Sequence, residues 1–121
     1  MRHIVVYISG KYSGEIEKNI QKAREMAIQV WEAGFTALTP HLNTYRFEID
    51  CKCNYEDYIQ GDLALLTCCD AILLLEGWGD SKGAIIERDF AIDNHLNVFY
   101  SLNELKQFYE VRQSTGLRQT N

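Results

Sequence analysis

The sequence feature that most constrains the fold is a short apolar run that leads through a glycine-bearing loop into a helix. The run Ala71–Leu75 is apolar at every position, which is typical of a strand buried on both faces of a parallel sheet. The loop that follows carries Gly77, Gly79 and Gly83. Backbone N–H groups converge where such a loop meets a helix N-terminus, and open α/β sheets bind ligands at this edge. The stretch Asp70–Ala91 therefore predicts a ligand site at the end of a central strand.

Glu87 is an acidic residue in an apolar position of the predicted helix. Its neighbours three and four residues away are small or apolar, namely Gly83, Ala84, Phe90 and Ala91. The carboxylate is therefore expected to point toward the sheet or the mouth of the ligand site. Because a buried carboxylate without a partner is costly, Glu87 is either paired within the structure or functional.

Asp62 is a second carboxylate on an apolar helix face. The stretch Tyr55–Cys69 predicts a helix whose inner face carries Tyr58, Ile59, Leu63, Leu65 and Leu66, and Asp62 lies on this same face. One misplaced acid is readily explained as a capped or paired residue. Two of them, on the helices that flank the Ala71–Leu75 strand, favour a functional pair.

The rest of the chain continues the alternation of strands and helices. Strands are predicted at Ile4–Ser9, Phe35–Thr39 and Asn97–Ser101, and a last helix at Leu102–Val111. The helix after the loop Gly10–Gly14 ends at Gly34 and carries an apolar stripe of Ile16, Ile20, Ala23, Ala27, Val30 and Trp31. This order predicts one domain over residues 1–111, with helices on both faces of a parallel sheet, and a polar tail at 112–121.

The segment His41–Asn54 has no periodicity and is predicted to be a long irregular loop. It is either a lid that contacts a ligand or a neighbouring subunit, or a surface excursion. His41 is expected to be a hydrogen-bonding residue of this loop rather than a catalytic base.

Composition and spacing exclude several classes of protein. A chain of 121 residues with a net charge of −5 is unsuited to a nucleic-acid polymer or an anionic membrane surface, and no apolar run is long enough to span a membrane. The N-terminus leads straight into a strand rather than a signal peptide, so a cytoplasmic protein with reduced thiols is expected. The pairs Cys51/Cys53 and Cys68/Cys69 lack the spacing of a zinc site. Neither glycine-bearing loop matches a P-loop or a dinucleotide fingerprint, which argues against an NTPase or an NAD-dependent oxidoreductase. No metal or cofactor is predicted.

Three motifs, in this order, resemble the nucleoside 2-deoxyribosyltransferase superfamily. They are VYISG in the first strand, D-L-x-L-L-x-x-C-D-A-I in the middle of the chain, and S-x-G-A-x-x-E at the start of the helix that carries Glu87. The likeness spans about residues 3–101 and is closest to the small deoxyribosyltransferase-like proteins of bacteria and their phages. It implies a three-layer, flavodoxin/Rossmann-like α/β fold with a parallel sheet of about four to five strands.

The resemblance also implies roles for individual residues. Glu87 would attack C1′ of an N-glycoside, and Asp62 would meet the leaving base and assist its protonation. The predicted substrate-binding residues are Tyr7, Ser9, Gly10, Lys11, Trp78, Ser81 and Gly83. Transferases of this superfamily use residues of a neighbouring subunit, so a homodimer or larger homo-oligomer is expected.

Ser81 bears on the substrate. Nucleoside-specific members of the superfamily carry an aspartate at the corresponding position, whereas members that hydrolyse nucleoside 5′-monophosphates carry a serine. Ser81 therefore favours a nucleotide as the substrate. Lys11 and Ser13 are further candidate partners of its phosphate. Ser81 is also explained as a helix N-cap. The predicted function is that of an N-glycosidase or deoxyribosyltransferase acting on a nucleoside 5′-monophosphate or a nucleoside. The alternative is a non-catalytic protein that binds a nucleotide or an ADP-ribose-like ligand.

Overall fold

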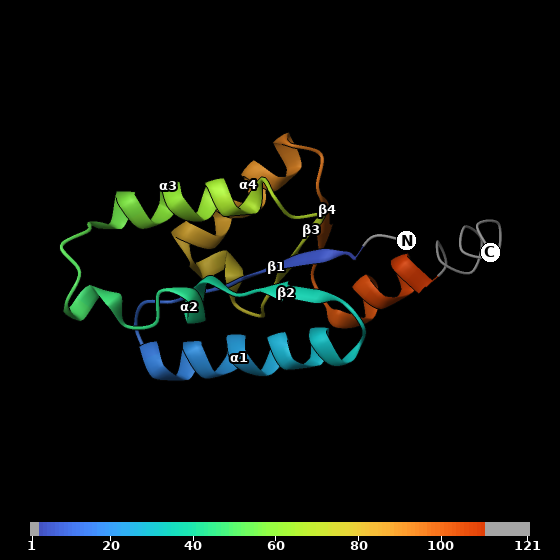
Figure 1. Ribbon diagram of the computed structural model, residues 1–121, viewed down its shortest axis with the longest axis horizontal. Coiled ribbons are helices and arrows are strands. Elements are labelled where there is room, and N and C mark those ends of the chain that lie inside the picture. Colours follow the sequence, from blue (N-terminus) through green and yellow to red (C-terminus); the bar gives the residue numbers. More distant parts are fainter. Residues whose placement is uncertain (1–2, 111–121) are drawn as a thin grey trace.

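The computed structural model describes residues 3–110, in which a four-stranded sheet lies between two layers of helices (Figure 1). The strands are β1 (Val5–Ser9), β2 (Thr36–Leu38), β3 (Ala71–Leu74) and β4 (Asn97–Phe99). The helices are α1 (Ile16–Glu32), α2 (Pro40–Asn43), α3 (Tyr55–Leu66) and α4 (Lys82–Asp93), and residues 102–110 are also helical. Two short 3₁₀ turns, η1 (Phe47–Ile49) and η2 (Trp78–Asp80), precede α3 and α4 respectively. None of the helices in this part of the chain is both long and apolar enough to cross a membrane.

The sheet is parallel throughout, with the strand order β2-β1-β3-β4. This confirms the predicted α/β fold with a parallel sheet of four strands. The two central strands, β1 and β3, pair through Tyr7 opposite Ile72 and Ser9 opposite Leu74. All four residues of β3 are buried, which is the burial that its unbroken apolar sequence predicts.

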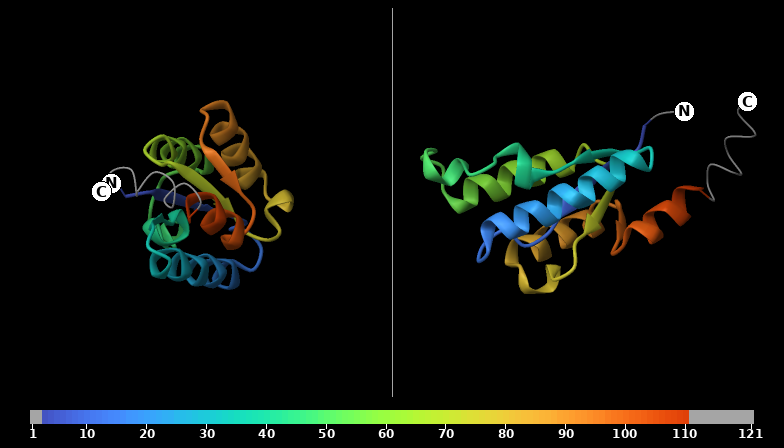
Figure 2. Two further views of the ribbon diagram at one scale, coloured as in Figure 1. Left: turned by 90° about the vertical axis from the view of Figure 1, so that its right-hand side faces the viewer. Right: turned by 90° about the horizontal axis from the view of Figure 1, so that it is seen from below.

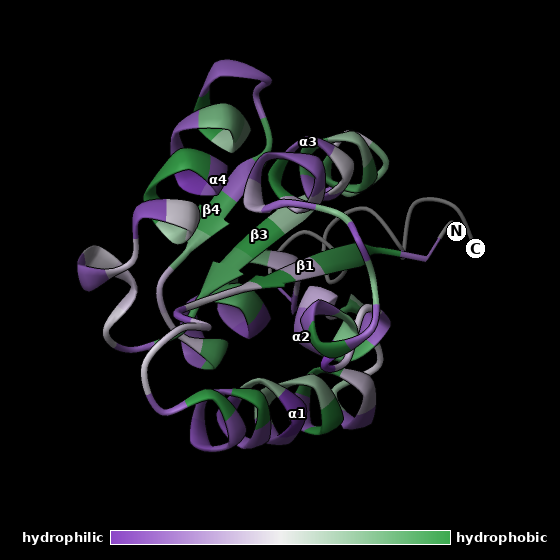
Figure 3. Cartoon of the chain, turned by 90° about the vertical axis from the view of Figure 1, so that its left-hand side faces the viewer, coloured by the Kyte–Doolittle hydropathy of each residue, from purple (hydrophilic) through white to green (hydrophobic). Residues whose placement is uncertain are grey.

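Side chains alternate along β1, and this alternation places the functional groups. Val6 and Ile8 face α1 and the helical residues 102–110, while Tyr7 faces the opposite layer, which contains α3 and α4. Ser9 follows Tyr7 by two residues and lies on the same face. Figures 2 and 3 show this three-layer arrangement, with hydrophobic strands enclosed between the two helix layers.

Two details of the helices differ from the prediction. Trp31 was expected in the inner stripe of α1, but it is 54% exposed. Val30 occupies the inward position in the last turn, and the next residue along a helix is rotated by about 100°, which carries Trp31 to the edge of the apolar face. The predicted helix Tyr55–Cys69 ends at Leu66 and continues as a turn.

The segment His41–Asn54 is also more ordered than its sequence pattern predicts. It contains the end of α2 and the turn η1 instead of being irregular throughout. Pro40 begins α2, because proline suits the first helical position, where no backbone N–H is needed. The predicted polar tail at 112–121 lies outside the described residues.

Candidate active site

A cavity of about 600 Å³ opens at the carboxyl ends of β1 and β3, the edge at which open α/β sheets bind ligands. Its walls come from the loop after β1, from α2 and the segment after it, from α3, and from the start of α4. The polar and aromatic residues that line it are Tyr12, Ser13, His41, Thr44, Glu48, Cys53, Tyr55, Tyr58, Asp62, Asp80, Ser81, Lys82 and Glu87.

Glu87 lies at the inner end of this cavity and is held by two hydroxyl groups of β1. The residue is only 7% exposed. Its Oε2 accepts a hydrogen bond from the Tyr7 hydroxyl at 2.7 Å, and its Oε1 accepts one from the Ser9 hydroxyl at 2.6 Å. Both donors come from the same face of one strand, so the position and orientation of the carboxylate are fixed by the sheet.

Burial raises the pKa of Glu87 to about 7, although the hydrogen bonds from Ser9 and Tyr7 act in the opposite direction. The nearby charge of Asp62 raises the pKa further. Burial and the charge of Glu87 hold the pKa of Tyr7 well above its usual value, so its hydroxyl remains a donor. Near neutral pH a substantial share of Glu87 is therefore ionised and desolvated, which is a suitable state for a nucleophile.

Asp62 projects from α3 into the same cavity. It is half-buried, and partial burial raises the pKa of its carboxyl group to about 6. The two acids thus come from different helices and share one cavity, as the sequence predicts for a functional pair. Because the Asp62 charge disfavours ionisation of Glu87, Glu87 holds its proton to a higher pH than it would without Asp62.

The N-terminus of α4 forms another wall. The Ser81 side chain caps this helix by accepting a hydrogen bond from the Ala84 backbone N–H at 3.1 Å, which confirms its capping role. Lys82 and Gly83 line the cavity beside it. A Cβ at Gly83 would lie 3.3 Å from the Tyr55 hydroxyl, so the glycine keeps this wall open.

Several cavity residues were missed from the sequence because they come from segments without periodicity. His41 is buried, and its Nε2 donates a hydrogen bond to the Lys11 carbonyl at 3.0 Å, in keeping with its predicted hydrogen-bonding role. Burial lowers the pKa of His41, which keeps its ring neutral. The Tyr12 ring packs against His41 at a centroid distance of 5.7 Å, and its hydroxyl donates to Glu48. The length and missing periodicity of His41–Asn54 were the signal for this wall, since a lid that contacts a ligand was one of the two expectations for that segment.

The predicted site residues fall into two groups. Glu87, Asp62, Gly10, Ser81 and Gly83 line the cavity together. The other four do not line it. Tyr7 and Ser9 are buried behind Glu87, and Lys11 is exposed. Trp78 packs against Tyr100, and the Arg88 guanidinium lies 4.7 Å from the centroid of the Trp78 ring.

Within residues 3–110 no group of three or more His, Cys, Asp or Glu side chains is placed to hold a metal ion. The four cysteines are free thiols.

Comparison with solved structures shows the same fold in two 2-deoxyribosyltransferases. The enzyme from the psychrotolerant bacterium Bacillus psychrosaccharolyticus has a TM-score of 0.60 and 15% identity, over 78% of this chain and 69% of that one. The enzyme from Leishmania mexicana has a TM-score of 0.58 and 14% identity, over 78% of this chain and 61% of that one. No curated protein matches this sequence. The model of the family described as a domain of unknown function, DUF4406, matches residues 4–100, and the chain belongs to this family.

Proposed function

We propose that the chain cleaves the N-glycosidic bond of a nucleoside 5′-monophosphate or a nucleoside, as an N-glycosidase or a deoxyribosyltransferase. The observation that carries this proposal is the buried Glu87 carboxylate, held by Tyr7 and Ser9 at the inner end of a cavity that also contains Asp62. The named activity of the two structural neighbours, which share the fold, points to the same chemistry.

In this mechanism Glu87 is the nucleophile. One of its oxygens forms a bond to C1′ while the bond from C1′ to the base nitrogen breaks, and the electron pair of that bond leaves with the base. Asp62 supplies the proton that the base nitrogen takes up. A water molecule or a second base then attacks C1′ and releases Glu87, and Asp62 accepts the proton of the attacking group.

The start of α4 supports a phosphate on the substrate. The N-terminus of this helix carries Ser81 and Lys82 on the cavity wall, and helix N-termini with a cation beside them stabilise anions. Opposing this, Glu48 and Asp80 place further carboxylates on the same cavity. The nucleoside and the nucleotide are therefore both tested as substrates.

A panel of ribonucleosides, deoxyribonucleosides and their 5′-monophosphates is incubated with the protein, with and without a second free base. Chromatography is then used to measure the released or exchanged base. We expect turnover of at least one compound, loss of turnover in Glu87→Gln, and full turnover in Glu76→Gln, a control at an exposed position outside the cavity.

A nucleoside with fluorine at C2′ tests the nucleophile directly, because fluorine slows the breakdown of a glycosyl ester. Mass spectrometry is expected to locate the added sugar on Glu87. A folded protein that binds a nucleotide by calorimetry, yet leaves the whole panel unchanged, would overturn catalysis and support a binding protein.

A further inference from the structure

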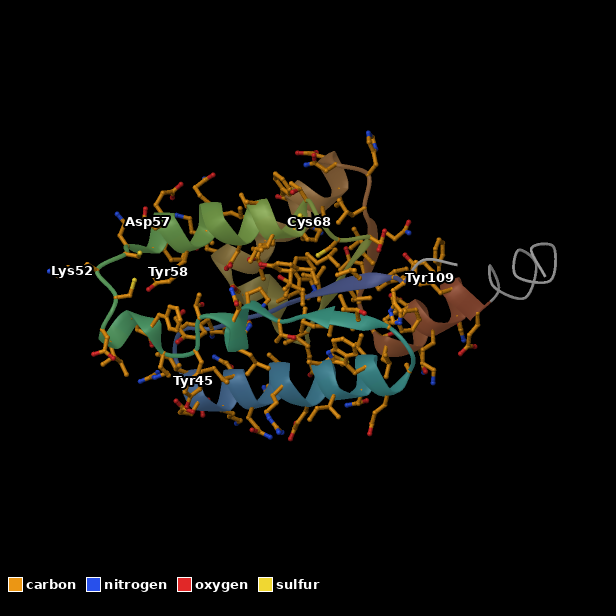
Figure 4. The ribbon with its side chains drawn as sticks, viewed as in Figure 1. Tyr45, Lys52, Asp57, Tyr58, Cys68 and Tyr109 are labelled. Atoms are coloured by element: carbon orange, nitrogen blue, oxygen red, sulfur yellow. The ribbon has the colours of Figure 1, made fainter. Side chains whose placement is uncertain are left out.

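Cys51 and Cys53 lie in the short segment between η1 and α3, at the rim of the cavity. Cys53 is exposed and lines the cavity, whereas Cys51 is half-buried. The Cys53 backbone N–H donates to the Cys51 sulfur at 3.4 Å, so the Cys51 side chain folds back over the residues that follow it. Figure 4 shows Lys52, between the two cysteines, projecting away from the molecule.

Tyr58 of α3 completes this group on the inner side. Its hydroxyl is buried and has no hydrogen-bond partner of ordinary geometry among the described residues. The nearby Cys51 thiol raises the pKa of this hydroxyl. Figure 4 shows the Tyr58 side chain on the side of α3 that faces the η1 segment, whereas Asp57 points away. The nearby Tyr58 hydroxyl and the hydrogen bond from the Cys53 backbone N–H lower the pKa of Cys51, against the opposing effects of burial and the Asp57 charge.

The other two cysteines lie outside the cavity and have different surroundings. Cys69 is buried, and burial raises the pKa of its thiol to about 11. Cys68 is exposed, and its sulfur lies 3.9 Å from the Ala64 carbonyl. Adjacent cysteines also bridge each other poorly, because their sulfur atoms diverge. Cys68 and Cys69 therefore provide an internal control for thiol chemistry.

We propose that Cys51 and Cys53 are a peroxide-reactive dithiol, in which Cys51 is oxidised first and Cys53 resolves it to a disulfide. The Cys51 sulfur attacks one oxygen of hydrogen peroxide, which gives a sulfenic acid and one water molecule. The Cys53 thiol then attacks the Cys51 sulfur, the S–O bond breaks, and a second water molecule leaves. Each peroxide thus oxidises two thiols. Because Cys53 and Tyr58 both line the cavity, this modification changes its wall.

The experiment treats the reduced full chain with one equivalent of hydrogen peroxide in the absence of any nucleotide, so its outcome is independent of the proposed function. We expect intact mass spectrometry to show the loss of two hydrogen atoms in a monomer, and peptide fragmentation to place the disulfide between Cys51 and Cys53. In Cys53→Ser the reaction is expected to stop at a Cys51 sulfenic acid that dimedone traps. Cys68→Ser is expected to behave as the wild type.

The role of Tyr58 is tested by the rate of the reaction. Tyr58→Phe is expected to slow oxidation of Cys51 severalfold at pH 7, because the thiolate loses the neighbouring hydroxyl that lowers its pKa. Tyr45→Phe, at an exposed position, is expected to leave the rate unchanged. Should peroxide oxidise Cys68 as fast as Cys51, or should the disulfide join two chains instead of Cys51 to Cys53, the proposal is wrong.

Discussion

At the scale of single residues, the least expected feature is Glu87, a buried acid whose ionised form lowers the stability of the folded state. Glu87 is 7% exposed, and its pKa lies near 7 instead of near 4.5. Tyr7 and Ser9 compensate only part of the cost of burial. Residues that a fold retains against its own stability are typical of functional sites. The sequence predicted the inward position of Glu87 from its apolar neighbours, but its two partners depend on the register of β1 against the helix layer.

This cost predicts how stability depends on pH. Because the pKa of Glu87 is raised in the folded state, its protonated form contributes to the free energy of unfolding. This contribution is fully present below about pH 4.5 and is lost as the pH rises through about 7. Replacement of Glu87 by Gln removes the charge. We expect Glu87→Gln to exceed the wild type in the free energy of unfolding at pH 8 by on the order of 3 kcal/mol, and to differ little at pH 4. Urea denaturation at both pH values measures this, and Glu76→Gln is expected to change neither. An unfolding free energy of Glu87→Gln below that of the wild type at pH 8 would contradict the assignment.

At the scale of elements, the helices that the sequence located well are those with local signals. The start of α3 is fixed by a capping box of Asn54 and Asp57, and the start of α4 by the Ser81 cap. By contrast α2 and η1 are short, and contacts distant in sequence hold them, such as His41 with Lys11 and Arg46 with Glu17. A pattern of apolar residues carries no information on such contacts, so the structure of this segment could not be predicted, although a lid over the ligand site was one of the two expectations for it.

The Ser81 cap offers a test of the substrate charge. Asp caps a helix as well as Ser does, so Ser81→Asp is expected to change the free energy of unfolding by less than about 0.5 kcal/mol. Its negative charge would repel a 5′-phosphate at the start of α4. We expect the affinity for nucleoside 5′-monophosphates to fall at least about tenfold, while the affinity for nucleosides is retained. Calorimetric titration measures both affinities.

Ser101→Asp is the matched control for that change, because Ser101 accepts a hydrogen bond from the Glu104 N–H at the start of the last helix, and it lies outside the cavity. Equal loss of nucleoside and nucleotide affinity in Ser81→Asp would show that the substrate phosphate does not reach α4.

The loop after β1 makes a second prediction at this scale. A Cβ at Gly10 would lie 2.7 Å from Cδ1 of Leu75 in the core, so Gly10→Ala is expected to lower the free energy of unfolding by about 1–3 kcal/mol. A Cβ at Gly61 within α3 would have open space around it, with no atom closer than 4 Å, and Gly61→Ala is expected to raise the free energy of unfolding by about 0.5–1 kcal/mol. Thermal and urea denaturation measure both changes. A stabilised Gly10→Ala variant would show that the Gly10 loop is not packed against Leu75 in solution.

At the scale of the whole molecule, the parallel sheet brings the two acids together. The crossovers that lead into and out of β3 place α3 and α4 on one face of the sheet (Figure 3). Asp62 of α3 and Glu87 of α4 therefore line one cavity at the carboxyl ends of the strands. The alternation of strands and helices predicted this general arrangement. The strand order β2-β1-β3-β4, which places Tyr7 and Ser9 next to β3 and under Glu87, does not follow from that alternation.

This convergence predicts separate effects of Asp62 on the leaving base and on Glu87. Asn at position 62 cannot donate a proton as an acid does, so Asp62→Asn is expected to lower turnover of ordinary nucleosides and nucleotides by about 100-fold or more. A 7-methylguanine nucleoside leaves as a neutral base without a proton, and its turnover is expected to fall less than about tenfold. The loss of the Asp62 charge also lowers the pKa of Glu87, which moves the acidic limb of the pH–rate profile to lower pH.

Asp93→Asn, at an exposed position on α4 outside the cavity, is the control. Equal losses for both kinds of leaving base would show that Asp62 positions the substrate instead of protonating it, and an unchanged acidic limb would show that the two carboxylates are not coupled in solution.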